Sequence, residues 1–155
     1  KIQVQSLPLG GTLVCVQLPA CPESARAATK ARGRVLLVDD ERAVADSLKH
    51  ALQDDFAVET ASSAREARAL LDAGRNFDVV LCDLMVPEVT GAEFFAQVKT
   101  QPPALRSRFV FMSGGVWSAS TSEFLERCGC PHVDKPFSLD ELRRLLRGLI
   151  DQPRA

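Results

Sequence analysis

The stretch Arg34-Val-Leu-Leu-Val-Asp-Asp-Glu41 decides the fold that we expect for this chain. Four apolar residues in a row, with a valine at each end, are typical of a strand that is covered on both faces of a parallel sheet. The run passes directly into three acids, whose like charges repel one another, and burial would increase the cost. The acids therefore predict either a helix cap or a cation at the end of the strand.

The region 33–150 continues this pattern along its whole length. Short apolar runs alternate with amphipathic segments, which predicts repeated strand–helix units. Such units indicate a doubly wound α/β sheet with helices on both faces, and right-handed crossovers leave few topologies. The predicted strands are Val35–Val38, an edge strand at Phe56–Thr60, Val79–Cys82, Phe109–Met112 and a weak strand at Val133.

Other signals mark the ends and the buried faces of the predicted helices. Three serines stand three residues before a glutamate, the spacing of a capping box: Ser63 and Glu66, Ser120 and Glu123, Ser138 and Glu141. Gly74 and Gly129 are placed as helix stops. The last helix is expected to bury Leu142, Leu145, Leu146, Leu149 and Ile150, and to expose Arg143, Arg144 and Arg147.

The composition excludes several classes of function. The chain has 155 residues, of which 46% are hydrophobic and 25% charged, so it can bury a globular core. A net charge of −1 argues against nucleic acid as a partner. We expect no membrane contact either, because no apolar run is long enough to span a bilayer and no secretory signal is visible. The five cysteines match no disulfide or metal pattern, which favours reduced thiols in a cytoplasmic protein.

Reactive side chains follow the central predicted strands. They are Asp39 and Asp40 after the first, Asp83 after the third, Ser113 after the fourth and Lys135 after the fifth. Because ligands of such sheets bind beyond the carboxyl ends of the strands, we expect all five around one crevice. Each residue alone has an ordinary explanation as a helix cap, a turn residue or a surface lysine. Their coincidence at one edge favours a site.

This set of side chains suits magnesium and a phosphoryl group. Mg²⁺ takes oxygen ligands, usually one or two carboxylates completed by waters and phosphate oxygens. A carboxylate can also act as a nucleophile and form an aspartyl phosphate. Phosphoryl transfer depends mainly on positioning and charge stabilisation, which Lys135 and Ser113 would supply at the phosphoryl oxygens. A divalent cation would explain why the acids stand together.

With these residues at its strand ends, the region 33–150 resembles the receiver domain of two-component response regulators. The resemblance rests on four motifs in order: Val38-Asp-Asp-Glu41, Asp83-Leu-Met-Val-Pro-Glu-Val-Thr-Gly91, Phe111-Met-Ser-Gly-Gly115 and Val133-Asp-Lys-Pro-Phe137. It implies the flavodoxin-like fold, a five-stranded parallel sheet in the order 2-1-3-4-5. It also implies a cis peptide bond after Lys135.

The resemblance assigns a role to each site residue. Asp83 would be phosphorylated, and Ser113 and Lys135 would hold the phosphoryl oxygens. The magnesium ligands would be Asp40, Asp83 and the backbone carbonyl of Met85, with Asp39 acting through a bound water. The phosphoryl donor would be the phosphohistidine domain of a histidine kinase, in the same or a partner chain. The domain would then change shape, and a relay onward to a histidine phosphotransfer protein is a further implied partner.

Two positions depart from the usual receiver pattern. Val86 replaces the usual methionine, which is a mild change of packing. His132 occupies the position of the aromatic switch residue, three before the lysine. We expect His132 to act as a switch together with Ser113, with a pH dependence because a histidine changes charge near neutral pH.

The first residues carry a second, shorter resemblance. Gly10-Gly-Thr-Leu-Val-Cys-Val-Gln-Leu-Pro19 is predicted to form one strand and resembles the closing strand of the ATP-binding domain of sensor histidine kinases. Residues 1–19 would then be a remnant of that domain, 20–32 a linker, 33–150 the receiver and 151–155 a tail. This order implies the C-terminal part of a hybrid histidine kinase, the alternative being an arbitrary N-terminal arm.

Several other functions remain to be weighed against a phosphorylated receiver. The sequence holds no ATP-site motif, so the fragment would catalyse only the phosphorylation and dephosphorylation of its own aspartate. Aspartyl-nucleophile phosphatases carry a second acid two residues after the nucleophile, where this chain has Met85. Phosphorylation-independent receivers typically lose an acid or the lysine, whereas all are present here. A dinucleotide-binding domain is disfavoured because no GxGxxG follows the first predicted strand of the sheet.

Overall fold

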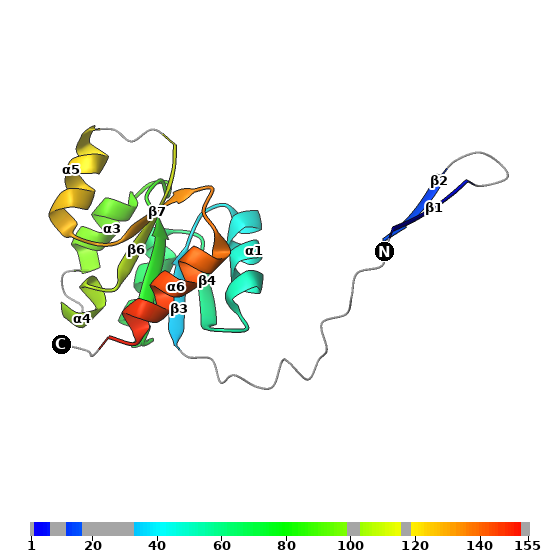
Figure 1. Cartoon of the computed structure of the whole chain (residues 1–155). Helices are drawn as coiled ribbons and strands as arrows, with labels where there is room; N and C mark the ends of the chain where they lie inside the picture. Colours follow the sequence, from blue (N-terminus) through cyan, green and yellow to red (C-terminus); the bar gives the residue numbers. More distant parts are fainter. Residues whose placement is uncertain (1, 7–11, 17–32, 99–102, 116–118, 153–155) are drawn as a thin grey trace.

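A computed structural model describes residues 2–6, 12–16, 33–98, 103–115 and 119–152 of the chain. Its main body is an α/β domain in which strands and helices alternate (Figure 1). The strands of this domain are β3 (Arg34–Val38), β4 (Ala57–Ala61), β5 (Val79–Asp83), β6 (Phe109–Gly114) and β7 (His132–Lys135). The helices are α1 (Arg42–Leu52), α2 (Ala64–Asp72), α3 (Gly91–Gln97), α4 (Pro103–Arg106), α5 (Ala119–Cys128) and α6 (Leu139–Ile150).

The five strands form one sheet in the spatial order β4-β3-β5-β6-β7, and every neighbouring pair is parallel. Numbered along the domain, this is the order 2-1-3-4-5, so the fold expected from the sequence is confirmed. The strand order turns back between β3 and β5, which are adjacent in the sheet. In open α/β sheets, that turning point is where ligands bind, beyond the carboxyl ends of the strands.

The sheet divides the hydrophobic core into two layers. Leu36 and Val38 of β3 pack on the side that holds α2, α3 and α5, whereas Val35 and Leu37 pack on the side of α1 and α6. Successive side chains of a strand point to opposite faces, so a run of four apolar residues serves both layers. This is why the central strands read as continuous apolar runs rather than as alternating patterns.

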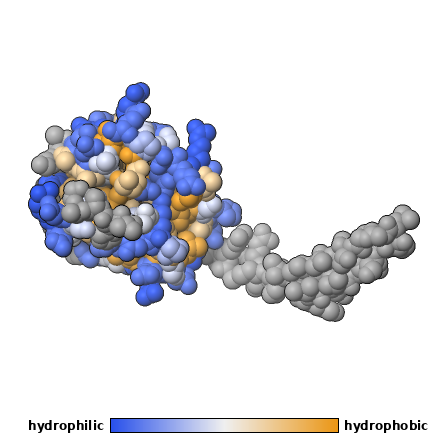
Figure 2. Space-filling view, turned by 90° about the horizontal axis from the view of Figure 1, so that it is seen from above, coloured by the Kyte–Doolittle hydropathy of each residue, from blue (hydrophilic) through white to orange (hydrophobic). Residues whose placement is uncertain are grey.

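The layer beneath α3 and α5 is rich in phenylalanine. Phe95 of α3 makes edge-on contacts with the rings of Phe109, Phe111 and Phe124, at centroid distances of 5.1 to 5.9 Å. Such tilted aromatic pairs contribute beyond their buried area. Outside the core, the view from above shows mostly hydrophilic side chains with smaller hydrophobic areas between them (Figure 2). Among the helices of the described ranges, none has the length and apolarity needed to cross a bilayer.

The helix ends agree only in part with the sequence signals. Gly74 and Gly129 follow their helices with φ of 76° and 66°, as expected for helix stops. Ser63 caps α2 by accepting the Glu66 N–H, but the Glu66 carboxylate accepts hydrogen bonds from the preceding Ser62 rather than from Ser63. Ser62 thereby lowers the pKa of Glu66, through its backbone N–H first and its hydroxyl second.

The other two predicted capping boxes are wrong in detail. Helix α5 begins at Ala119, so Ser120 lies inside its first turn instead of before it. Ser138 is the N-cap of α6 by position, but its side chain makes no capping hydrogen bond. A complete box occurs instead at α3, where Thr90 accepts the Glu93 N–H and the Glu93 carboxylate accepts the Thr90 N–H. This pair was not among the predicted boxes, although Thr-x-x-Glu is a standard form of the motif.

Replacement of Thr90 by alanine should lower the free energy of unfolding by about 1 kcal/mol, because the N–H of Glu93 loses its acceptor. Ser138→Ala is a matched control, since Ser138 also stands at an N-cap but makes no side-chain cap bond. Urea unfolding followed by circular dichroism would measure both. An equal loss in the two variants would show that the hydrogen bond at Thr90 is not what stabilises the start of α3.

The remaining differences from the sequence expectations are small. The short helix α4 was not predicted. Strand β5 extends one residue farther than predicted and β6 two, so Asp83 and Ser113 lie within strand ends. On α6, Leu145 and Ile150 are only partly buried. Arg143 is not simply exposed, because it pairs with Asp55 at 3.2 Å and donates to the carbonyl of Ala51.

The N-terminal region contains an antiparallel pair, β1 (Ile2–Ser6) and β2 (Thr12–Val16), with Val4 opposite Val14. The strand predicted after the glycine pair corresponds to β2. Its partner β1 was not predicted, because Gln and Ser weaken the apolar pattern of residues 2–6. The proposed linker 20–32 and the proposed tail 151–155 fall largely outside the described residues.

Candidate phosphoacceptor site

Three of the predicted site residues meet at the carboxyl edge of the sheet. The ammonium of Lys135 donates to Asp83 Oδ2 at 2.6 Å and to Asp39 Oδ2 at 3.0 Å. The three residues come from the ends of three different strands, β3, β5 and β7, and are separated by up to 96 positions in the chain. Only the parallel topology brings them together, which is the outcome expected from the strand ends.

Both aspartates are buried. Asp39 is 1% exposed and Asp83 is 8% exposed, so neither carboxylate can rely on water for its hydrogen bonds. The second oxygen of each carboxylate accepts a hydrogen bond from a backbone N–H two residues farther along the chain. Asp39 Oδ1 accepts from the N–H of Glu41, and Asp83 Oδ1 accepts from the N–H of Met85, both at 2.9 Å. This local pattern is the Asx turn. It fixes the orientation of the two carboxylates before any ligand is bound.

Lys135 supplies a positive charge beside Asp39, at the end of the apolar stretch Val35–Val38. Burial alone would lower the pKa of Lys135, but its hydrogen bonds to Asp83 and Asp39, together with their charges, raise the pKa above its ordinary value. The ammonium form is therefore held at neutral pH. The next peptide bond, Lys135–Pro136, is cis, as the resemblance implied.

The other predicted residues lie around this centre. Ser113 is buried, and Met112, which precedes it, pairs with Asp83 in the register of β5 and β6. Asp40 follows Asp39 and is exposed. Met85 is 71% exposed, two residues after Asp83. His132 is exposed at the start of β7, opposite Phe111.

The donor set fits a divalent cation. Two buried carboxylates, those of Asp39 and Asp83, share the one ammonium of Lys135, so negative groups outnumber the cation that they contact. Asp40 follows Asp39 in the chain and is exposed. Within the described residues, no group of three or more His, Cys, Asp or Glu side chains is arranged so that it could hold a metal ion. Mg²⁺ does not need such a group of three, because it usually binds one or two carboxylates and keeps waters and phosphate oxygens as its other ligands.

Sequence reasoning missed the two backbone donors of the site. The N–H groups of Glu41 and Met85 donate to the two buried carboxylates, whereas only the carbonyl of Met85 was predicted to take part in the site. The signal was available, because an aspartate at the start of a loop commonly binds the N–H two residues on. Gly91, the last residue of the motif that begins at Asp83, donates its N–H to the carbonyl of Leu84 and closes the loop that follows Asp83.

Comparison with known proteins agrees with this geometry. The family model of the response regulator receiver domain matches residues 35–147, which is most of the chain. The chain belongs to the response regulator receiver family. The receiver identity and the fold inferred from the sequence are thus both confirmed.

Several curated relatives of this receiver are named as transcriptional regulatory proteins. It is 45% identical over 118 residues to the hydrogenase transcriptional regulatory protein HoxA of Cupriavidus necator, covering 76% of this chain and 24% of that protein. It is 36% identical over 113 residues to the alginate biosynthesis transcriptional regulatory protein AlgB of Pseudomonas aeruginosa, covering 72% of this chain and 24% of that protein. The receiver spans about a quarter to a half of the length of such relatives.

Solved receivers share the fold. The chemotaxis protein CheY4 of Vibrio cholerae superimposes with a TM-score of 0.64 at 30% identity, over 75% of this chain and 97% of that one. A CheY-like receiver of Methanospirillum hungatei superimposes with a TM-score of 0.68 at 27% identity, over 76% and 93%. Both matches cover nearly the whole of the solved domain, so the likeness extends to the complete receiver.

Proposed function

We propose that this receiver accepts a phosphoryl group from a phosphohistidine onto Asp83 and then changes conformation. The observation that carries the proposal is the pair of hydrogen bonds from Lys135 to Asp83 and Asp39. Together with the N–H of Met85, these bonds hold a buried carboxylate in a fixed orientation at the ligand-binding edge of the sheet. Receivers in general exchange phosphoryl groups with histidine kinases or phosphotransfer proteins, which makes those the expected partners.

The proposed step follows from the chemistry of the side chains. A carboxylate oxygen of Asp83 attacks phosphorus and the P–N bond to the donor imidazole breaks. The bonding electrons stay on the imidazole nitrogen, which takes up a proton from solvent. As the carboxylate becomes an acyl phosphate, Lys135 can turn from the carboxylate oxygen to a phosphoryl oxygen. Ser113, buried on the neighbouring strand, would donate its hydroxyl to another.

Magnesium belongs to this proposal. Asp40, Asp83 and the carbonyl of Met85 would hold the ion, with Asp39 acting through a bound water. When bound, the ion would neutralise charge on the phosphoryl oxygens. The excess of carboxylates over ammonium at this edge supports such an ion.

The conformational response would pass through Ser113 and His132. His132 stands on β7 opposite Phe111 and two residues along the chain from Asp134, which faces Ser113 across the sheet. The phosphoryl group adds roughly 1.5 to 2 negative charges at neutral pH. That change would bias a two-state surface near α5, β7 and α6.

The first test is modification by a small donor. After incubation with acetyl phosphate, intact-mass analysis should show a gain of one phosphoryl group in the presence of Mg²⁺ and none when EDTA removes the metal. Release of phosphate without a stable adduct would favour an aspartyl-nucleophile phosphatase. An unmodified chain that still binds its partner would favour a phosphorylation-independent interaction domain.

We propose further that this receiver comes from the C-terminal part of a hybrid histidine kinase in the cytoplasm. Support comes from the glycine pair that precedes β2, in residues 1–19, and from the free thiols of Cys82, Cys128 and Cys130. The names of the curated relatives favour a second context, a transcriptional regulator. The coding sequence around this segment decides between them: upstream ATP-site motifs would support the kinase, and a DNA-binding region downstream would contradict it.

A further inference from the structure

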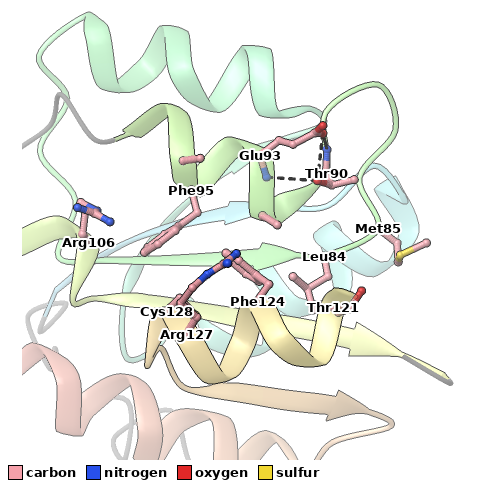
Figure 3. A pocket seen from close by; sticks show the side chains of 12 residues that line it. Leu84, Met85, Thr90, Glu93, Phe95, Arg106, Thr121, Phe124, Arg127 and Cys128 are labelled. Carbon is pink, nitrogen blue, oxygen red and sulfur yellow. Dashed lines mark hydrogen bonds between the residues drawn. The ribbon is translucent and has the colours of Figure 1, made fainter. Parts of the chain in front are cut away.

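A pocket opens between α3 and α5, on the face of the sheet opposite α1 and α6. Its volume is about 580 Å³, which lies in the range of roughly 300–1,000 Å³ typical of small-molecule sites. Its apolar wall consists of Leu84, Phe95 and Phe124. Arg106 lies at one end and Met85 at the other, with the two phenylalanines between them (Figure 3).

Two guanidinium groups border this apolar wall, from Arg106 of α4 and Arg127 of α5. Neither forms an ion pair with a carboxylate of the described ranges. Glu123 stands one turn before Arg127 on the same helix, yet the structure forms no bridge between them within those ranges. On α2, by contrast, Arg68 pairs with Asp72 four residues along the helix, at 2.8 Å.

The guanidinium of Arg106 is positioned by an aromatic ring, but one of its hydrogen-bond donors has no acceptor among the described residues. Its guanidinium lies over the ring of Phe95, 5.1 Å from the centroid. Its Nε is buried and has no hydrogen-bond partner among the described residues. When a planar guanidinium stacks on an aromatic ring, the N–H groups in its plane can still donate hydrogen bonds. Two of these N–H groups match the two oxygens of a carboxylate in bidentate geometry. Buried donors without acceptors are rare and require an explanation.

The acid on the pocket wall cannot be that acceptor. Glu93 lines the pocket, but its Oε2 accepts from the N–H and the hydroxyl of Thr90, as the dashed lines of Figure 3 show. Its carboxylate is therefore committed to the cap of α3. The described lining thus offers an apolar wall, two unpaired positive groups and one acid that is already satisfied.

We propose that this pocket binds a small organic acid with an aromatic or aliphatic body, whose carboxylate is taken by Arg106 and Arg127. The apolar body would lie against Phe95, Phe124 and Leu84. This inference goes beyond the phosphoryl-acceptor function and does not depend on it. Leu84 and Met85 directly follow Asp83, so the same loop serves both the pocket and the phosphoacceptor edge.

Calorimetric titration with phenylbutyrate tests the proposal, with its uncharged amide as the matched probe. The acid should bind, and the amide should bind about tenfold more weakly or worse, because it lacks the charge that a guanidinium recognises. The substitutions Arg106→Gln and Arg127→Gln should each lower the affinity for the acid by about tenfold. Arg144→Gln, at an exposed arginine of α6, should leave the affinity unchanged.

Several outcomes would overturn the proposal. The first is that phenylbutyrate does not bind, and the second is that its amide binds with the same affinity as the acid. The third is that Arg144→Gln lowers the affinity for the acid as much as Arg106→Gln and Arg127→Gln do. Amide NMR spectra provide the second readout: shifts on titration should gather at Phe95, Phe124 and Cys128. If the NMR signals of these residues shift with protein concentration when no small molecule is added, the pocket is occupied by a second copy of the chain, and the proposal is wrong. Because Arg127 is exposed, its variant should fold even where Arg106→Gln does not.

Discussion

Asp83→Asn is expected to abolish the adduct formed with acetyl phosphate and Mg²⁺, while the domain remains folded. An amide oxygen can still accept the N–H of Met85, so the loop keeps its local hydrogen bond. The amide is not a nucleophile toward phosphorus, however, and it removes one of the two charges that face Lys135. Intact-mass analysis would measure the adduct, and circular dichroism would verify the fold.

A matched control exists on α2. Asp72→Asn makes the same chemical change at an aspartate whose hydrogen bonds to Arg68 lie on the surface. Exposed ion pairs contribute little to stability, so this variant should be modified like the wild type. If Asp83→Asn still gained a phosphoryl group, peptide mapping would locate it, and Asp39 or Asp40 would replace Asp83 as the acceptor.

Gly91→Ala should lower the free energy of unfolding by about 2–3 kcal/mol, because no room exists for one added carbon. A Cβ at Gly91 would stand 2.6 Å from the carbonyl oxygen of Asp83 and 3.1 Å from the Cα of Leu84. Both contacts are with backbone, which cannot turn away as a flexible side chain could. Relief would require the loop after Asp83 to shift, so the rate of modification by acetyl phosphate should fall as well.

Gly148→Ala supplies the opposite control with the same substitution. A Cβ at this position in α6 meets no atom within 4 Å. Alanine is the better helix former by about 1 kcal/mol, so this variant should be as stable as the wild type or more so. Urea unfolding would compare the two. A stability of Gly91→Ala within about 0.5 kcal/mol of the wild type would mean that the loop yields easily.

The architecture was largely predictable because its signals are regular. Continuous apolar runs such as Val79–Cys82 can be buried on both faces only in a sheet that is covered on both sides. The residues at the strand ends then followed from parallel topology, which brings Asp39, Asp83 and Lys135 together without any local signal that links them. Ser63 and the two glycine stops were predictable because their determinants lie within one helical turn.

Some of the misses depend on features that the local sequence does not determine. Whether Ser138 caps its helix depends on its side-chain rotamer, and whether Arg143 is exposed depends on Asp55, 88 positions away across the fold. The pocket between α3 and α5 was invisible in the sequence for the same reason. Arg106 and Phe95 belong to different helices, and only tertiary packing places the guanidinium over the ring.

The two-layer core has a consequence for how this domain can vary in evolution or design. Leu36 and Leu37 are chain neighbours, yet they pack into separate layers with different helices. A change of volume at Leu36 can therefore be compensated by Ala67 or Leu71 of α2, but not by its neighbour Leu37. Paired substitutions should consequently occur at spacings of two within a strand, or between a strand and the helices on one side. Each half of the interior can then be repacked while the other keeps its sequence.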